Sequence, residues 1–242
     1  MPYYGYGGYG YYGFDPTIII LIPAILFTIY AQFKVSSTTS RFLKVKTQRG
    51  FTGEQVARRI LESNGLYNVR IEMVRGHLSD HYDPRSKVLR LSDTVYGSTS
   101  VAAVGVATHE CGHAIQHARG YAPLKLRSTL VPIANFGAKI AWPLILIGLL
   151  FTSESSSLFI NLGIIAFSGA VLFQLITLPV EFNASNRAIR MITDSGMMYG
   201  EEIVAARKVL NAAALTYVAS AATAILQLLR IILLTGGRRR ND

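Results

Sequence analysis

Residues 155–180 read SSSLFINLGIIAFSGAVLFQLITLPV and contain no charged side chain. An α-helix rises 1.5 Å per residue, so this stretch is long enough to cross a bilayer core of about 30 Å. It is followed at once by the polar sequence EFNASNR. We therefore expect a transmembrane helix over residues 155–180 that returns the chain to an aqueous side.

Three further segments have the same character. Residues 15–33 carry no charge after Asp15, residues 128–153 carry only Lys139, and residues 209–235 carry only Arg230. Apolar stretches of this length are typical of membrane-spanning helices. The sequence therefore predicts about four apolar membrane segments.

The composition of the chain agrees with a membrane protein. Half of the 242 residues are hydrophobic and 16% are charged, where a soluble protein carries about 25%. This balance excludes a disordered chain and a coiled coil, and the single cysteine, Cys111, excludes a disulfide scaffold.

Residues 34–127, between the first two apolar segments, are polar. Thr52 and Gln55 form the pattern of a capping box, which predicts a helix from there to about Asn64, and residues 69–74 and 87–92 alternate like short strands. A second helix is expected from Ser98 or Ser100 to Gly120. The expected fold is an α-helical integral membrane protein with a small α+β domain.

The charge distribution predicts which side of the membrane this domain occupies. The formal net charge is +10, and residues 34–130 hold 15 of the 24 Lys and Arg residues against seven acids. Basic loops stay on the cytoplasmic side, so we expect the domain and residues 181–208 in the cytoplasm of a multi-pass plasma-membrane protein. No basic patch interleaved with aromatic residues is present, so nucleic acid is not an expected partner.

The two ends of the chain are less regular. Residues 1–14 consist almost entirely of Gly and Tyr and predict a flexible tail, and residues 236–242 form a basic tail. If residues 209–235 span the bilayer, the arginines at 238–240 fall outside, against the charge rule. A helix lying in the membrane interface would keep them inside, and both arrangements remain open at this stage.

Residues 109–113 read HECGH, which is an H-E-x-x-H pattern within the predicted second helix. His109 and His113 are four residues apart, so both lie on one helix face and can bind a single Zn²⁺ ion. Glu110 faces the same cleft and can exchange a proton with a metal-bound water. A chance match of three fixed residues at this spacing is expected in well under ~1% of chains of this length.

A catalytic zinc ion requires a third protein ligand and one open position. Few acids lie outside the polar domain. Glu154 falls in the expected outside turn, whereas Glu181 follows the third apolar segment and returns to the same side as the HECGH helix. Glu181 is therefore the predicted third ligand, although a carboxylate that only favours a helix start is the simpler alternative.

Two further residues, Cys111 and His117, lie in or beside the motif but are not predicted metal ligands. Cys111 points to the opposite helix face and is expected to be a small buried residue. His117 continues the face of the two histidines. It either supports a metal ligand or acts as a partial cation at the helix C-terminus.

The chain resembles the YugP-like zinc-dependent membrane peptidases, which are related to the HtpX and CAAX-prenyl membrane gluzincins. The resemblance covers about residues 14–235 and rests on FDPTIIILIPAILFTIYAQ, on DHYDPRSKVLRLSDTVYGSTSVAAVGVATHECGHAIQ, on EFNAS and on AAALTYVASAATAILQLLR. It implies a gluzincin-like catalytic domain with one zinc ion per chain, bound by His109, His113 and Glu181, with Glu110 as general base.

The resemblance also suggests supporting residues. The wider gluzincin pattern E-x-x-A-D has an acid where this chain has Ser185, and a hydroxyl can accept a hydrogen bond from an imidazole without carrying charge. Gluzincins hold an extended substrate at a strand edge and stabilise the oxyanion with Tyr, His or Arg. His81, Tyr82 and Arg187 are the candidates for the second role, and a plain structural turn is the alternative for the first two.

These observations predict a membrane-bound zinc metalloendopeptidase that hydrolyses membrane or membrane-proximal polypeptides with a zinc-activated water. Two other classes remain in view. A zinc-stabilised scaffold or chaperone partner would keep the histidines without needing Glu110. A transporter would use charges inside apolar segments, of which Lys139 and Arg230 are the best examples, but both can extend toward an interface.

Overall fold

We describe the protein from a computed structural model, which covers residues 16–76, 78–151 and 156–236. The Gly/Tyr tail over 1–14, Glu154 in the expected outside turn and the arginines at 238–240 lie outside the described residues.

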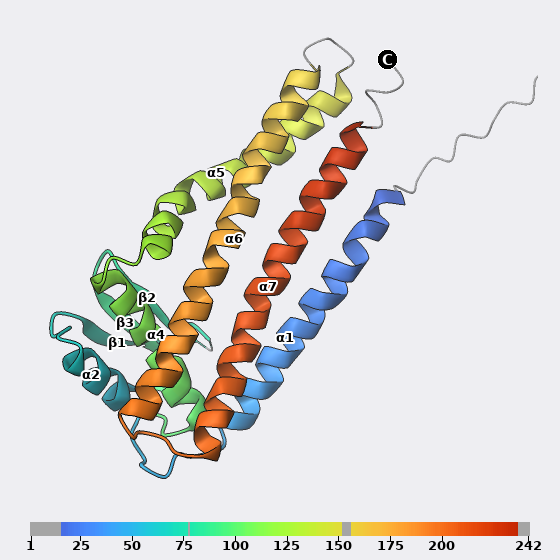
Figure 1. Ribbon diagram of the computed structural model, residues 1–242. Coiled ribbons are helices and arrows are strands. Elements are labelled where there is room, and N and C mark those ends of the chain that lie inside the picture. Colours follow the sequence, from blue (N-terminus) through green and yellow to red (C-terminus); the bar gives the residue numbers. More distant parts are fainter. Residues whose placement is uncertain (1–15, 77, 152–155, 237–242) are drawn as a thin grey trace, which may run out of the picture.

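Four long helices form the body of the molecule (Figure 1). A short 3₁₀ helix, η1 (Pro16–Leu21), leads into α1 (Ile22–Phe42), and the others are α5 (Ala122–Leu150), α6 (Ser156–Asp194) and α7 (Glu201–Gly236). All four are long and apolar enough to cross a membrane. The predicted fold class, a helical integral membrane protein with a small α+β domain, is confirmed.

Large apolar side chains cover the outside of these helices. Phe33 on α1 and Leu150 on α5 are each 70% exposed, and Phe136 and Ile165 are each 67% exposed. Apolar surface costs about 25 cal/mol per Å² in water, so a belt of such residues is stable only against lipid.

Close packing joins α5 to α6 through glycine. A Cβ atom at Gly137 would lie 2.6 Å from the Ala166 carbonyl oxygen, and one at Gly163 would lie 3.0 Å from that of Ala141. Small residues let helix backbones approach where no hydrophobic effect drives association, as in a bilayer.

The register of α1 against α7 is marked by one polar contact. The Thr28 and Thr223 hydroxyls lie 3.2 Å apart, and the two helices run antiparallel along most of their length (Figure 1). The end of α7 therefore lies beside the start of α1. This arrangement agrees with a fourth span better than with a helix lying flat in the interface.

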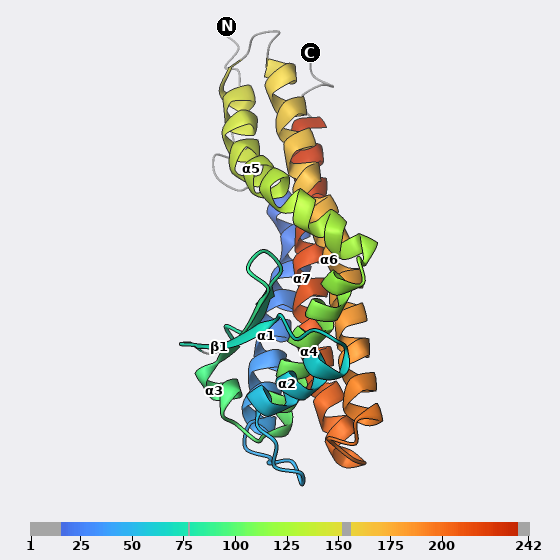
Figure 2. The same cartoon turned by 90° about the vertical axis from the view of Figure 1, so that its left-hand side faces the viewer.

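The polar domain lies against the lower parts of α1, α6 and α7 (Figure 2). It contains α2 (Gly53–Ser63) and α4 (Val101–Ala118), with the short α3 (Asp93–Tyr96) between the sheet and α4. The capping box of Thr52 and Gln55 is confirmed, and Ser100 caps α4 by accepting from the Ala103 amide.

A small sheet covers one side of α4. It comprises β1 (Arg70–Val74), β2 (His81–Asp83) and β3 (Val88–Ser92) in the order β1-β3-β2. β1 pairs parallel with β3, and β2 pairs antiparallel with it. The first and last strands were predicted. The second lies in the stretch that reads as a turn, because three residues between turn-forming neighbours are too few to show an alternating pattern.

The longest helix differs from the segments expected from sequence. α6 runs without interruption from Ser156 to Asp194, through Pro179 and past Glu181. Glu181 is therefore inside a helix, and the interpretation of its carboxylate as a helix-start group is wrong. Proline is tolerated inside membrane helices because neighbouring groups satisfy the freed carbonyl.

Candidate metal centre

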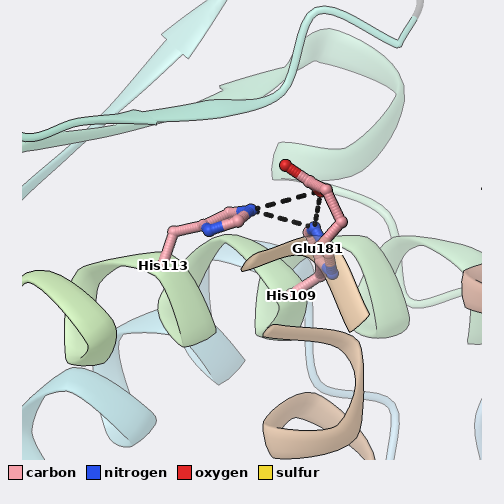
Figure 3. A group of neighbouring side chains, drawn as sticks. All are labelled: His109, His113 and Glu181. Carbon is pink, nitrogen blue, oxygen red and sulfur yellow. Dashed lines mark hydrogen bonds and ion pairs between the residues drawn. The ribbon is translucent and has the colours of Figure 1, made fainter. Parts of the chain in front are cut away.

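Two histidines of α4 point into one site. Their Nε2 atoms lie 3.1 Å apart, and the rings meet edge to face with centroids 4.7 Å apart. His113 is buried and His109 is nearly so. The i,i+4 spacing brings the two imidazoles together on one face of the helix, as the sequence predicted (Figure 3).

Glu181 reaches the same point from α6 (Figure 3). Its Oε2 atom lies 3.3 Å from His109 Nε2 and 3.6 Å from His113 Nε2. The donor atoms of the three residues lie within 4.8 Å of one another, and Glu181 is only 2% exposed. The structure thus brings together all three residues that the sequence suggested as ligands.

This donor set fits a zinc ion. Two ligands held at about 2.0–2.1 Å in a tetrahedral site lie about 3.3 Å from each other, close to the three observed spacings of 3.1, 3.3 and 3.6 Å. Among the described residues, Glu181 Oε2 is the one buried side-chain polar atom without a hydrogen-bond partner. A buried polar atom in this state requires a partner, and a cation between the three residues would supply it.

The electrostatics of the site favour a positive charge. Burial on its own would lower the pKa of the His113 imidazole, but the Glu181 and Glu110 carboxylates outweigh burial and raise it. The field that favours a proton on His113 also favours a metal cation at the same place.

Arg127 on α5 holds the other oxygen of Glu181. Its Nη1 atom donates to Glu181 Oε1 over 2.7 Å. The ion pair offsets part of the cost of burying the carboxylate and leaves Oε2 directed at the histidines. Arg127 could not be recognised from the sequence, because its contact with Glu181 depends on how α5 packs against α6.

Gln116 supports the other side of the site and was also missed. Its Oε1 atom lies 3.0 Å from His113 Nδ1, which fixes that nitrogen as the N–H donor. Its amide group donates to the Val180 carbonyl and to Asn183 Oδ1, each over 2.9 Å. Gln116 is fully buried. It ties the ligand helix α4 to the turn of α6 that carries Glu181.

Ser185 occupies the position that the sequence analysis singled out. Its hydroxyl lies 3.1 Å from His109 Nδ1, so it can accept the N–H of that imidazole. Each histidine therefore has a neutral hydrogen-bond partner on the nitrogen that faces away from the site. Such partners orient an imidazole and set its tautomer.

Gly112, inside the HECGH motif, explains why α4 and α6 approach so closely. A Cβ atom at this position would lie 2.8 Å from the Ala184 carbonyl oxygen. Ala184 lies between Glu181 and Ser185, so the absence of a side chain at Gly112 lets both reach the histidines.

Glu110 and Tyr217 complete the surroundings of the three residues. Glu110 is only 8% exposed, and its carboxylate makes no hydrogen bond within the described part of the chain. Tyr217 comes from α7, and its largely buried phenol is near enough to the Glu181 and Glu110 carboxylates to be influenced by their charges. The sequence could not place Tyr217 here, because it sits in an apolar segment more than a hundred residues from HECGH.

The remaining histidine of α4 faces the sheet. Tyr82 of β2 places its hydroxyl 2.9 Å from His117 Nδ1, with ring centroids 5.8 Å apart. Burial and the neighbouring Asp83 raise the pKa of Tyr82. His117 does not belong to the group of possible metal ligands, and its contact instead ties β2 to the end of α4.

Two other sequence candidates lie away from the three residues. Side chains alternate along a strand, so His81 points away from Tyr82, and its ring contacts the Ser79 carbonyl and Arg90. Arg187 donates to Asn183 over 2.7 Å. Neither is brought to the histidines.

Cys111 is a structural residue, as expected. It is fully buried on the opposite face of α4, and its thiol donates to the Ala57 carbonyl at 3.7 Å. Burial raises the pKa of this thiol, so it is not a reactive nucleophile.

Comparison with known proteins agrees with this site. Residues 17–236 match the model of a family described as "Putative neutral zinc metallopeptidase". The chain is 48% identical to "Putative membrane protease YugP" of Bacillus subtilis (strain 168) over 225 residues, which is 93% of this chain and 99% of that protein. No solved structure matches the chain.

Proposed function

The chain belongs to this neutral zinc metallopeptidase family, and we propose that it is a membrane-bound endopeptidase whose zinc is held by His109, His113 and Glu181. The observation that carries the proposal is the meeting of three donor atoms within 4.8 Å around a buried carboxylate oxygen that lacks a hydrogen-bond partner. Two His and one Glu leave the fourth position of a tetrahedral ion open, as catalytic sites require.

The bound metal would act as a Lewis acid toward water and the scissile carbonyl. Glu110 is the general base in this proposal: it takes a proton from the attacking water and later gives it to the leaving amine. Its carboxylate is suited to this role because no other described residue occupies it by hydrogen bonding. Arg127, Gln116 and Ser185 hold the three ligand side chains in place.

Tyr217 is the group best placed to stabilise the oxyanion. Its phenol is a neutral donor within electrostatic range of both Glu110 and Glu181. A hydroxyl that donates to the developing negative charge lowers the barrier without changing the charge of the site. In this proposal Tyr217 stabilises the oxyanion. The sequence suggested His81, Tyr82 or Arg187 for that role.

The height of the site supports membrane-proximal substrates. Thr28 and Thr223 lie at the same level on α1 and α7. Lys34 is six residues from Thr28, and Tyr217 is six residues from Thr223, both toward the polar domain. Each therefore lies about 9 Å further along its helix, and the two are at a similar height. Lys34 is the first charge after the apolar part of α1, and Glu181 is the first after that of α6. The site therefore lies near the level of the bilayer surface, where a polypeptide emerging from lipid would meet it.

The strand β2 offers a place for an extended substrate. In the part of the chain that the structure describes, β2 pairs only with β3, so its outer edge is unpaired. Its Tyr82 contacts His117, one turn beyond His113. A substrate strand added at this edge would run past the metal ligands, with main-chain hydrogen bonds supplying affinity for varied sequences.

The proposed location of the site is the cytoplasmic face of the plasma membrane. The polar domain and the basic excess of residues 34–130 lie at the same end of the helices. The positive-inside rule retains such a domain in the cytoplasm. The Arg230 side chain contacts Thr17 in η1, at the other end of the helices, which agrees with a charge that extends toward an interface.

Hydrolysis by purified protein in detergent tests the proposal. We expect cleavage of unfolded casein that stops when a chelator removes the metal and returns on addition of zinc. Magnesium should not restore it, because two imidazoles are poor ligands for Mg²⁺. Cleavage that continues in the metal-free protein would refute the proposed function, and zinc binding without cleavage would favour a scaffold.

A further inference from the structure

A cavity lies between α1 and α7, at the end of these helices that carries the polar domain. Its volume is about 580 Å³. Three cationic side chains line it, Lys34 and Arg41 from α1 and Lys208 from α7. None of these residues belongs to the metal centre.

The three cations have no acidic partner. Within residues 16–76, 78–151 and 156–236, no ion pair involves Lys34, Arg41 or Lys208. Like charges around one cavity repel one another, and a bound anion would remove that repulsion. The Arg41 guanidinium also lies over the Phe42 ring, 5.4 Å from its centroid, which restricts its position.

Neutral groups in the cavity complement the cations. The Thr38 hydroxyl and the Asn211 amide can donate to anionic oxygens, whereas Leu215 makes the cavity apolar at the end nearer the membrane. The Ser37 hydroxyl already donates to the Lys34 carbonyl over 3.2 Å. A ligand with an anionic head and an apolar body matches this division.

The cavity begins at the height of lipid headgroups and extends beyond it toward the aqueous side. Lys34 ends the uncharged part of α1, and Arg41 is seven residues further along the helix, about 10 Å beyond it. The headgroup layer is about 5–8 Å thick on each side of a bilayer. The register set by Thr28 and Thr223 brings Lys208 within about one turn of the level of Arg41.

The outer surface beside the cavity is suited to acyl chains. Ile29 and Phe33, on the membrane side of Lys34, are 61% and 70% exposed. A lipid with its phosphate among the three cations would lay its chains along this apolar surface of α1.

We propose that this cavity binds the phosphate headgroup of an anionic phospholipid, which bridges α1 to α7. Each Lys or Arg near an anionic surface adds to the attraction for a negatively charged headgroup. The lipid would hold α7 against α1 about one turn from the level of Tyr217. The proposal depends only on the membrane fold and is independent of peptidase activity.

The test is a binding measurement on the full chain in nonionic detergent, with phosphatidylglycerol as the probe. The triple variant K34Q/R41Q/K208Q removes the three charges, and R75Q/R85Q/K87Q removes three exposed charges from the sheet side as a matched control. Native mass spectrometry gives the dissociation constant for bound lipid. Phosphatidylcholine and millimolar inorganic phosphate are the comparison ligands.

We expect phosphatidylglycerol to bind the K34Q/R41Q/K208Q protein at least about tenfold more weakly than wild type, and to bind the control variant as tightly as wild type. Phosphatidylcholine should bind weakly to all three. Unchanged binding to K34Q/R41Q/K208Q would overturn the proposal. Inorganic phosphate that displaces the lipid at equal concentration would also overturn it, by identifying a site for free phosphate. If the triple variant misfolds, the single variant K208Q, which keeps two of the cations, replaces it. We expect K208Q to bind phosphatidylglycerol more weakly than wild type, by a smaller factor than the triple variant.

Discussion

Arg127 binds one oxygen of the Glu181 carboxylate and leaves the other oxygen facing the histidines. The guanidinium binds Oε1 over 2.7 Å, and Oε2 is left 3.3 Å from His109 Nε2. A free carboxylate on a long side chain can rotate, whereas one oxygen held by a charged donor fixes the direction of the other. The arginine would thus position the proposed ligand Glu181 without itself contacting a bound metal.

Replacing Arg127 should therefore weaken zinc binding without removing it. Partners that orient a metal ligand typically contribute 10–100-fold in affinity, and we expect a loss in this range for R127Q. Zinc affinity is measured by competition with a chromogenic chelator. The E181A variant, which deletes the ligand, sets the scale of full loss, and K125Q, on the exposed side of the same helix turn, is the control. Wild-type affinity in R127Q would show that the ion pair is incidental.

The close approach of α4 and α6 predicts a cost for any side chain at Gly112. G112A would place a Cβ atom 2.8 Å from the Ala184 carbonyl oxygen, and neither helix backbone can yield easily. Overpacking of this kind costs about 1–3 kcal/mol, so we expect a lower Tm in a thermal melt. G169A, where nothing lies within 4 Å of the new methyl group, is the control and should melt at or slightly above the wild-type temperature.

Tyr217 should affect turnover and leave the metal in place. Loss of one oxyanion donor costs about 10²–10³ in kcat. We expect Y217F to retain zinc and KM while kcat for a peptide substrate falls toward this range. Y30F, at a lipid-facing tyrosine of α1, serves as the matched control. A normal kcat in Y217F would show that Tyr217 does not stabilise the oxyanion, and that Tyr82 or a group on the substrate does.

The orientation in the membrane can be read from cysteine accessibility. The native Cys111 is fully buried and should not react with the labelling reagent. Any labelling therefore comes from the introduced cysteine. We expect S156C, at the start of α6, to be labelled from outside intact cells by an impermeant reagent, and R85C to be labelled only after permeabilisation. The reverse pattern would place the metal centre outside the cell.

The sequence alone predicted the parts of the site that depend on local geometry. His109 and His113 are one helical turn apart, so their convergence follows from the helix itself. Glu181 followed from the scarcity of acids and from the number of spans. Ser185, four residues further along the same helix, was singled out because it occupies the position where the wider gluzincin pattern has an acid.

The groups that surround the ligands could not be predicted in this way. Arg127 and Tyr217 reach the site from α5 and α7, and their positions depend on how these helices pack. Gln116 is on α4 itself, and only its contacts with Val180 and Asn183 depend on the packing of α6. The residues that flank an arginine or a tyrosine in the sequence do not show which other helix its side chain will contact. The misplacement of Glu181 at a helix start has a similar origin, because a proline and a change from apolar to polar sequence resemble a helix boundary when neighbours are unknown.

The most direct test of the central claim is a comparison of zinc content and hydrolysis in E110Q. Glu110 is not a ligand in this account, so E110Q should fold, retain about one zinc ion per chain by metal analysis and lose hydrolysis by about 10²–10⁴-fold. E62Q, at an exposed acid of α2, should match wild type in both measurements. Equal proteolysis in wild type and E110Q would contradict the account, because the activity would then belong to another protein in the preparation and not to this site.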